Sequence, residues 1–450
     1  MKKEKKKIFV IVGAVVACLA VVYVGFGIFF QSHFCFGTTI DGIKAGGKSV
    51  EKVEQLITEE IDSYVLNLAE REDGSESISG ESIQIAPVFN GEVEELLNGQ
   101  NGFAWVVTLF KHDNLELAKV VTFDEDALDS QIDQLNCMQA SEQREPVDAT
   151  VSAYTADGYS LVPADYGTTI DKNTFKKAVE DSILVLADEL DLDEADCYVK
   201  PEIEDDNEKL LAVIDEMNSY VGTTITYDFD VAKEVLDGER ISEWLSVDDD
   251  LNLVVDEEGV LSFVKELASE YNTCYKPKEL KTSYGSTVTI SNGPYGWKIN
   301  NSEEVAQILD DLKAGKKVER EPVYAQTANS HGENDYGNSY VEINLTAQHL
   351  FLYKDGVLVT ESDFVSGNVA KGHATPGGAF MLTYKTLNAV LRGPDYETPV
   401  TYWMPFNGDI GMHDLTSRKA FGGDIYKTRG SHGCINLPYS AAKKIYETID

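Results

Sequence analysis

The chain has 450 residues, 43% of them hydrophobic, which is enough apolar material for several cores. Its formal net charge of −39 argues against a nucleic-acid-binding protein, because an acidic surface repels phosphate. The excess of negative charge lies between residues 32 and 330, since residues 1–31 are basic and residues 331–450 are nearly balanced. We expect this acidic middle to be a solvated, self-repelling spacer and not an acidic docking surface.

The N-terminus combines five lysines with a long apolar run. The lysines lie within the first seven residues, and residues 8–30 form a stretch of 23 residues without a charge. A run of this length spans a bilayer, and flanking lysines keep that side in the cytoplasm. A cleaved signal peptide would have a shorter apolar core. Residues 1–31 are therefore predicted to be a cytoplasmic tail and a single transmembrane anchor, with the rest of the chain outside the cell.

Two similar series of elements follow in the middle of the chain. Each has an acidic residue opening an amphipathic helix (residues 122–128 and 254–260), a strand-like run (149–154 and 286–290), and a Tyr-Gly pair. The pairs begin at Tyr166 and Tyr295, a period of 129 residues, which is longer than solenoid repeats. Each series ends with a helix, and Asn173 and Ser302 are suitable N-caps for these two helices. The pattern predicts two α+β domains, at 32–200 and 201–330.

The acidic stretch 188–208 is expected to be the linker between these domains. Its Asp-x-Asp texture invites comparison with a calcium loop, but it lacks the glycine and the distal glutamate of one. In layout and in the Tyr-Gly landmark, residues 36–329 resemble the peptidoglycan-binding repeats that precede cell-wall enzymes on Gram-positive surface proteins. The resemblance implies binding to peptidoglycan; a rigid spacer that holds the next domain is the alternative.

Residues 331–450 change to short strands. Alternating runs at 340–345 and 350–353, a turn at 354–356 and further short runs up to 400–404 are typical of a β-sandwich or a partly open barrel. Pro438 then opens a terminal helix at 439–449, since proline suits the first helical turn. The fold class predicted for the whole chain is a multidomain protein: a transmembrane helix, two α+β repeat domains and a mostly-β C-terminal domain.

One of the six cysteines, Cys434, has neighbours in sequence that are typical of a catalytic thiol. Cys137, Cys197 and Cys274 are scattered and expected to be small buried hydrophobes, whereas Cys434 follows His432 and Gly433. A thiol becomes a good nucleophile only as a thiolate, and an imidazole is the usual base that takes its proton. Both His432 and His413 are candidates on sequence alone. A glycine beside the thiol would let backbone N–H groups turn inward, as an oxyanion hole requires.

Three motifs lie in residues 348–353, 374–380 and 431–436 (Gln-His-Leu-Phe-Leu-Tyr, Ala-Thr-Pro-Gly-Gly-Ala-Phe and Ser-His-Gly-Cys-Ile-Asn), and seventeen residues separate His413 from Ser431. Together they resemble the L,D-transpeptidase catalytic domain. The resemblance implies that Cys434 is the nucleophile, His413 its base and Ser431 the residue that orients this histidine. It further implies oxyanion N–H groups from Gly433 and Cys434. The residues implied to shape the site or contact substrate are His432, Arg429 and Asn436, and Tyr402 and Trp403 are candidate walls of the channel. Asp414 could orient His413, but we expect it to be an exposed turn residue.

The activity implied is acyl transfer without nucleotide or metal: attack on a peptidoglycan stem tetrapeptide, release of D-Ala and a 3→3 cross-link to a neighbouring stem. The expected partners are stem peptides, glycan and the membrane, at the outer face of the cell. Three alternatives remain. Water could replace the acceptor amine, giving an L,D-carboxypeptidase. His413, Asp414, His432 and Cys434 could bind a metal, although the paired cysteines of structural zinc sites are absent. A non-catalytic wall-binding protein would have no need of both His413 and Cys434.

Overall fold

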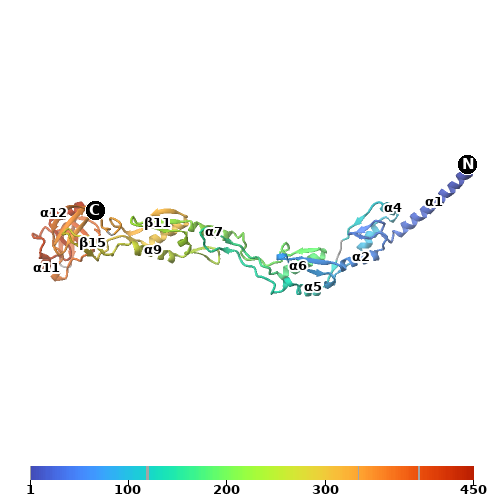
Figure 1. The fold of residues 1–450 in the computed structure, drawn as a ribbon, viewed down its shortest axis with the longest axis horizontal. Coiled ribbons are helices and arrows are strands. Elements are labelled where there is room, and N and C mark those ends of the chain that lie inside the picture. The colour runs from blue at the N-terminus through green and yellow to red at the C-terminus, as the bar shows by residue number, and fades with distance from the viewer. Residues whose placement is uncertain (1, 118–120, 333, 394–395, 450) are drawn as a thin grey trace. The chain divides into compact units, whose positions relative to one another are not determined.

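The computed structural model describes residues 2–117, 121–332, 334–393 and 396–449. The chain divides into two compact units: residues 1–150 with 162–207, and residues 151–161 with 208–450. Figure 1 follows the chain in colour from its N-terminal helix to its C-terminal helix. Both units contain α+β folds, and the second also contains the β-rich C-terminal part.

The first unit begins with one long helix and continues with short elements. In chain order these are α1 (Lys2–Phe29), β1 (Thr39–Ile40), β2 (Ile43–Lys44), α2 (Val50–Asp62), β3 (Val65–Ala69), η1 (Arg71–Asp73), β4 (Ser75–Ser79), η2 (Glu81–Ile83), β5 (Ala86–Pro87), α3 (Glu92–Gly99), η3 (Gly102–Ala104), α4 (Trp105–Thr108), β6 (Asn114–Leu115), β7 (Val121–Thr122), α5 (Glu125–Ile132), η4 (Asn136–Met138), β8 (Thr150–Val151), β9 (Leu161–Val162), α6 (Lys172–Leu184) and β10 (Glu189–Asp191).

The second unit has more strands, especially near its end. Its elements are α7 (Glu208–Val221), β11 (Thr224–Asp228), β12 (Lys233–Leu236), α8 (Gly238–Ser242), β13 (Leu245–Val247), β14 (Leu253–Val255), α9 (Glu257–Tyr271), β15 (Lys278–Lys281), β16 (Thr287–Ile290), β17 (Lys298–Ile299), α10 (Asn301–Lys313), β18 (Lys317–Arg320), β19 (Tyr324–Gln326), β20 (Tyr340–Asn344), β21 (His349–Lys354), β22 (Val357–Asp363), η5 (Val369–Lys371), β23 (Thr386–Gly393), β24 (Tyr396–Asn407), β25 (Ile410–Asp414), α11 (Ile425–Arg429), β26 (Ile435–Leu437) and α12 (Tyr439–Thr448).

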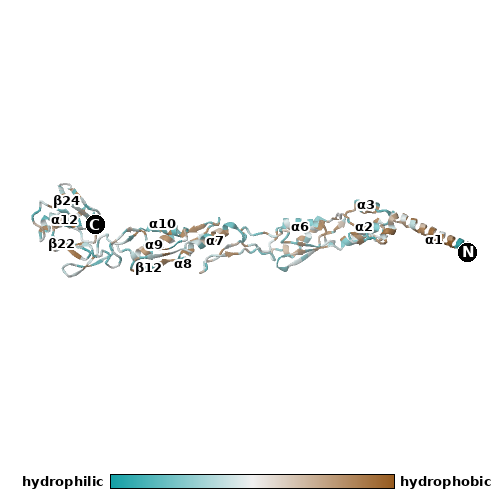
Figure 2. Ribbon diagram, turned by 90° about the horizontal axis from the view of Figure 1, so that it is seen from above, coloured by the Kyte–Doolittle hydropathy of each residue, from teal (hydrophilic) through white to brown (hydrophobic). Residues whose placement is uncertain are grey.

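The long apolar helix expected from the sequence is present as α1. Its candidate membrane span is Glu4–Phe29, in which all charged residues precede Ile8, and no residue of its most apolar stretch is buried. Figure 2 shows the change from a hydrophilic start to a hydrophobic helix. Length and composition suffice to cross a bilayer.

The two α+β parts use the same order of elements. In the first unit α2 leads into the antiparallel pair β3–β4, and after α5 and α6 the strand β10 pairs in parallel with β3. In the second unit α7 leads into β11–β12, and after α9 and α10 the strand β18 pairs in parallel with β11. The expectation of α+β domains in the middle of the chain is confirmed.

Two local expectations in this region are wrong. The N-caps of α6 and α10 are Asp171 and Asn300, whose side chains accept the N–H groups of Thr174 and Glu303. The stretch 188–208 is not a linker throughout, because it contains β10 and supplies buried core residues to the first unit: Leu190, Leu192, Cys197 and Tyr198. Of the three cysteines expected to be buried, Cys197 is, whereas Cys137 and Cys274 are only partly buried.

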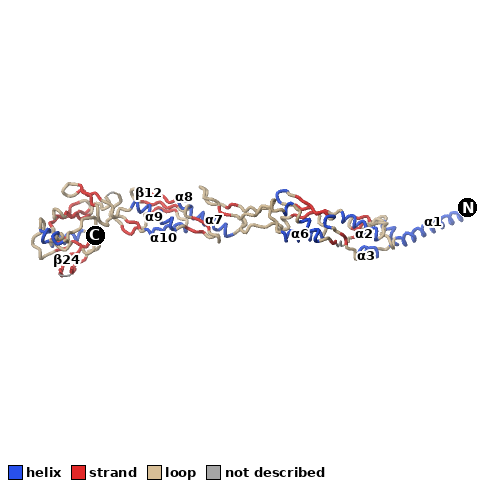
Figure 3. The backbone as a smooth tube through the Cα atoms, turned by 90° about the horizontal axis from the view of Figure 1, so that it is seen from below, coloured by secondary structure: helices blue, strands red, loops and turns tan. Residues whose placement is uncertain are grey.

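The C-terminal part is β-rich with a terminal helix, as expected, and consists mainly of strands and loops (Figure 3). It has a three-stranded sheet, β20-β21-β22, and a four-stranded sheet, β23-β24-β25-β26. One apolar cluster joins both sheets to α12, and its members include Leu352, Phe364, Met404, Met412 and Ile445. Side chains alternate along strands, so Trp403 and His413, which are register partners, face away from this cluster.

Candidate active site

Cys434 lies at the start of β26, beside the turn that joins β24 to β25. β26 runs parallel to β25 with Met412 opposite Ile435 and His413 opposite Asn436. The Cys434 Sγ is 3.6 Å from the carbonyl oxygen of Asp409 in this turn. Burial raises the pKa of the Cys434 thiol, and the charge of Asp409 adds to this, while the backbone amide of Gly411 opposes it. The sulfur therefore carries its proton at neutral pH.

His413 lies on β25 with 4% of its surface exposed. Its Nδ1 is 2.9 Å from the carbonyl oxygen of Asp414. A carbonyl can only accept, so Nδ1 carries the hydrogen and Nε2 keeps a lone pair. Burial lowers the pKa of His413, against the raising effect of Asp414, so the ring is neutral at neutral pH. A neutral imidazole with a free Nε2 is suited to act as a base.

Asp414 is buried, contrary to the expected exposed turn residue, and is only 3% exposed. Its Oδ1 accepts the backbone N–H groups of Thr401 and Tyr402, each at 2.8 Å. The carboxylate thus fastens β24 to the end of β25. It is the backbone carbonyl of Asp414, not its side chain, that orients His413.

The Ser431 hydroxyl makes its hydrogen bonds within its own loop. It donates to the carbonyl oxygen of Cys434 at 2.6 Å and accepts the N–H of Gly433 at 3.0 Å. The loop is also held by the backbone of Ser366 and Asn368, which pairs with that of Ser431 on both sides. The orientation of His413 that was expected from Ser431 comes instead from Asp414, and the Gly433 N–H that was expected in an oxyanion hole is engaged by Ser431.

Thr375 holds the next peptide group of this loop. Its Oγ1 donates to the carbonyl oxygen of Gly433 at 2.6 Å and accepts the N–H of Gly367 at 3.0 Å. Because a peptide unit is planar, fixing the Gly433 carbonyl also fixes the direction of the Cys434 N–H. Gly433 has φ = +131°, which glycine adopts without strain. Thr375 belongs to the motif at residues 374–380, but the sequence alone did not indicate a role for it.

The remaining expected site residues divide between the site face and the core. Trp403 shares the face of His413, with ring centroids 5.9 Å apart. The exposed His432 lies with its ring 4.8 Å from that of His373. Arg429 is exposed, and Asn436 is buried in β26. Tyr402 lies in the core against Tyr439 and Tyr446 of α12, so it is on the wrong face of β24 to wall a channel at Cys434.

The loop that carries Thr375 is fastened to the α+β domain within the same unit. The Ala379 N–H donates to the Asn292 carbonyl at 2.8 Å, and the Tyr295 N–H donates to the Ala379 carbonyl at 3.2 Å. Gly293 between them has φ = +107°, and a Cβ there would lie 2.0 Å from the Ala379 oxygen. Only glycine permits this approach.

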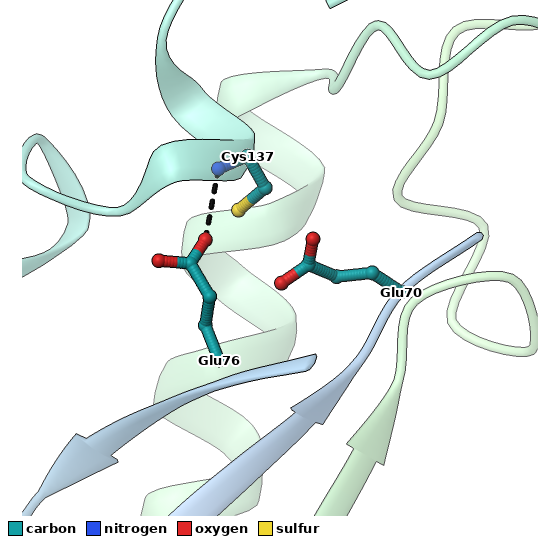
Figure 4. A group of neighbouring side chains, drawn as sticks. All are labelled: Glu70, Glu76 and Cys137. Carbon is teal, nitrogen blue, oxygen red and sulfur yellow. Dashed lines mark hydrogen bonds between the residues drawn. The ribbon is translucent and has the colours of Figure 1, made fainter. Parts of the chain in front are cut away.

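One group of metal-ligating atoms within mutual reach occurs in the described part of the chain, and it lies far from Cys434 in sequence. Glu70, Glu76 and Cys137 place ligand atoms within 4.8 Å of one another (Figure 4). Both oxygens of Glu76 already accept hydrogen bonds, from the N–H groups of Asn136 and Cys137. Burial and the two nearby carboxylates raise the pKa of the Cys137 thiol, which keeps it protonated. Glu76 therefore caps the start of η4.

Comparison with known proteins identifies both parts of the second unit. Residues 338–450 match the "L,D-transpeptidase catalytic domain" and residues 206–320 the "Putative peptidoglycan binding domain". The crystal structure of a mutant L,D-transpeptidase from Enterococcus faecium is 32% identical, over 53% of this chain and 96% of that chain, with a TM-score of 0.44. The E. faecium catalytic domain acylated by ertapenem, solved by NMR, is 42% identical over 25% of this chain and 92% of that one, with a TM-score of 0.24.

No curated protein matches the chain. The enterococcal enzyme is nevertheless matched over nearly its whole length at an identity of about one third. This agreement, together with both domain matches, shows that the chain belongs to the L,D-transpeptidase family, with its catalytic domain preceded by a domain of the peptidoglycan-binding type.

Proposed function

We propose that this chain is a peptidoglycan L,D-transpeptidase that forms 3→3 cross-links through a thioester on Cys434. The observation that supports this most is that two neutral groups lie on neighbouring segments: the partly buried Cys434 thiol just before β26 and the buried His413 imidazole on β25. Each is held in the protonation state from which a proton can pass from sulfur to nitrogen when substrate arrives.

In the first step, His413 Nε2 takes the thiol proton and the thiolate attacks the carbonyl carbon between the third stem residue and the terminal D-Ala. A C–S bond forms and the carbonyl electrons move to oxygen. When the carbonyl re-forms, the C–N bond breaks and the leaving D-Ala nitrogen takes the proton from His413. The products are free D-Ala and a thioester on Cys434.

In the second step, an amine of a neighbouring stem attacks the thioester carbon and gives its proton to His413. A new C–N bond forms, the C–S bond breaks, and the sulfur regains the proton. The Cys434 N–H is the donor that we assign to the developing oxyanion, because the Gly433 N–H is engaged by Ser431. Thr375 and Ser431 position this peptide; Trp403, His432, Arg429 and Asn436 remain candidates for substrate contact.

We further propose that α1 crosses the membrane with its lysines in the cytoplasm and that both units act outside the cell. The apolar helix and a domain of the cell-wall-binding type support an extracytoplasmic location. The shared element order of the two α+β parts supports the division into domains at 32–200 and 201–330, although the second unit begins at Glu208 apart from residues 151–161. Whether these domains bind glycan or act as spacers is decided by a pull-down on insoluble peptidoglycan.

The proposal is tested by incubating the full chain in detergent with a disaccharide-tetrapeptide and analysing the products by mass spectrometry. A dimer that has lost one D-Ala supports transpeptidation and identifies the acceptor amine. A tripeptide monomer alone would show an L,D-carboxypeptidase. Unchanged substrate, with Cys434 still open to alkylation, would contradict both activities on this substrate.

A further inference from the structure

Residues 102–110 form an apolar segment on the surface of the first unit. The segment has no charged residue, and most of its large side chains face solvent. The exposed fractions are 38% for Phe103, 39% for Val106, 60% for Val107, 49% for Leu109 and 88% for Phe110. Exposed apolar side chains scattered singly are common, but five within one short segment mark an interaction site.

This segment packs against the last turns of α1. The Tyr23 hydroxyl donates to the Phe103 carbonyl at 2.7 Å, and the Trp105 Nε1 donates to the Tyr23 carbonyl at 3.1 Å. The rings of Phe26 and Trp105 are 4.9 Å apart. Gly27 leaves room for the Phe103 ring, since a Cβ there would lie 2.4 Å from it. The segment and the helix end therefore form one apolar surface.

The length of α1 sets the depth of this contact. A span needs about 20 apolar residues at about 1.5 Å each to cross a hydrocarbon core of about 30 Å. Counted from Ile8, the first residue after the lysines, such a span ends near Gly27. Tyr23 then lies roughly 6 Å inside the outer edge of the core. Its partners Phe103 and Trp105 must lie at a similar depth.

The backbone of the segment is suited to such a position. It winds through η3 and α4, so that the Ala104 N–H donates to the Asn101 carbonyl at 2.8 Å and the Phe110 N–H to the Val107 carbonyl at 3.1 Å. The Thr108 hydroxyl donates to the Trp105 carbonyl at 2.8 Å. Local pairing of this kind is what a backbone needs where water is scarce.

We propose that residues 102–110 insert into the outer leaflet of the membrane beside α1 and form a second membrane-contacting element. The ligand is lipid: its acyl chains contact Val107, Leu109 and Phe110, and Tyr23 and Trp105 lie in the outer part of the hydrocarbon core, next to the interfacial zone where such rings concentrate. A second copy of the chain is disfavoured, because a stable protein interface buries about 800 Å² per partner, more than five partly exposed side chains of one segment offer. The inference rests on α1 being transmembrane.

The test places the photoreactive residue p-benzoylphenylalanine at single positions of the full chain. Phe110 is the test position, Phe9 in α1 (81% exposed) the positive control, and Val357 in the C-terminal domain (65% exposed) the matched exposed apolar control. Each variant is reconstituted in vesicles of phosphatidylglycerol and phosphatidylethanolamine, irradiated and analysed by intact mass. All three side chains are mostly exposed, so the substitutions leave the cores untouched.

Lipid adducts at positions 110 and 9, with none at 357, are the expected result. An adduct at position 9 without one at 110 would overturn the insertion of the segment while leaving α1 as a membrane span. No adduct at either position would overturn the membrane placement of α1 and, with it, the inference. A chain-to-chain adduct at position 110 would identify a second copy as the occupant and would also overturn the proposal.

Discussion

Two of the buried polar clusters in the second unit do opposite things. In the α+β domain, Glu304 is fully buried and accepts from the Tyr227 hydroxyl at 2.6 Å and from Arg320 at 2.7 Å. Burial lowers the pKa of Arg320, but Glu304 and its neighbours more than compensate and the pKa ends up raised. In the catalytic domain, burial instead drives His413 and Cys434 toward their neutral forms. Charges that are paired stabilise a fold, whereas groups that burial keeps neutral are available for chemistry.

The first unit shows that the shared element order does not require a buried charge. The fourth residue of α6 is Phe175, which is 0% exposed, and the fourth residue of α10 is Glu304, also 0% exposed. Leu68 on β3 and Ile183 on α6 complete an apolar core in the first unit. The same arrangement can therefore be filled with apolar or with paired polar side chains. The ion pair is a local solution and not a condition of the topology.

Removing the proposed nucleophile should have the largest effect on activity and a small effect on stability. We expect Cys434→Ala to abolish acylation by a carbapenem, measured by intact mass, and to change the free energy of unfolding by less than about 1 kcal/mol, since surface-near substitutions without lost partners cost little. Cys274→Ala, at another partly buried cysteine of the same unit, should retain the adduct. An adduct on Cys434→Ala would move the nucleophile elsewhere, and a large loss of stability would make Cys434 structural.

The proposed base should show nearly as large an effect on rate. His413→Asn is expected to slow acylation by roughly 10²–10⁴-fold, the usual contribution of a general base. Asp414→Ala should mainly reduce stability, because it leaves the Thr401 and Tyr402 N–H groups without their acceptor. Stopped-flow acylation and thermal unfolding of both variants test this division. Equal rate losses for the two variants would contradict it.

Breaking the Glu304–Arg320 pair should reduce stability and leave acylation unchanged. Glu304→Ala leaves Arg320 without its carboxylate and is expected to cost about 3–5 kcal/mol, as for other buried pairs that lose one partner. Acylation of the protein that remains folded should be unchanged. Glu303→Ala, at the exposed neighbour in the same helical turn, is the matched control. Urea unfolding followed by circular dichroism measures the difference; similar midpoints for the two variants would mean that the cluster is not stabilising.

Thr375 tests the positioning of the oxyanion donor. Thr375→Val should slow acylation by roughly 10–100-fold, somewhat less than the loss of a whole oxyanion donor. In the Thr375→Val variant, iodoacetamide should alkylate Cys434 at a rate close to that in the unchanged chain, because no oxyanion develops during alkylation. Thr375→Ser should restore acylation, and Thr360→Val on β22 should leave it unaffected. A parallel fall in alkylation would show that Thr375 places the sulfur and not the peptide N–H.

The smallest expected effect concerns pH. Burial holds the pKa of His413 below its ordinary value near 6.5, so the unfolded chain binds this proton more readily. The stability contributed by the neutral ring is therefore present above about pH 6.5 and is lost as the pH falls below that value. Unfolding free energies of the unchanged chain and of His413→Asn should converge as the pH falls. Parallel curves would indicate that His413 is not kept neutral by the fold.

The proposed nucleophile and base could be picked out from sequence because Cys434 and His413 belong to motifs with fixed spacing, whereas the buried residues that support them could not. The acceptor role of Asp414 depends on N–H groups twelve and thirteen residues away on another strand. The burial of Glu304 depends on Tyr227, 77 residues distant. The sequence around Asp414 and around Glu304 therefore does not indicate these distant partners.

Two other features that were predicted wrongly, the strand within 188–208 and the N-cap of α6, do leave a signal in the sequence. In the stretch 188–208, Leu190 and Leu192 alternate with acidic residues, which is the period of a half-buried strand, and both leucines are buried. The many acidic residues in this stretch led to the prediction of a linker in place of a strand. Likewise Asp171, two residues before Asn173, is an equally good N-cap type, and only the geometry selects it.

The attachment of Ala379 to residues 292–295 has a practical consequence for cutting the chain into fragments. The catalytic match begins at residue 338, but Glu342 just beyond it is 5% exposed and accepts from the Ser283 N–H and hydroxyl. A fragment starting at 338 would leave this carboxylate and the Ala379 backbone without partners. A fragment that keeps these contacts therefore begins before Glu208, where the second unit's continuous part begins, whereas one cut at the family boundary loses them.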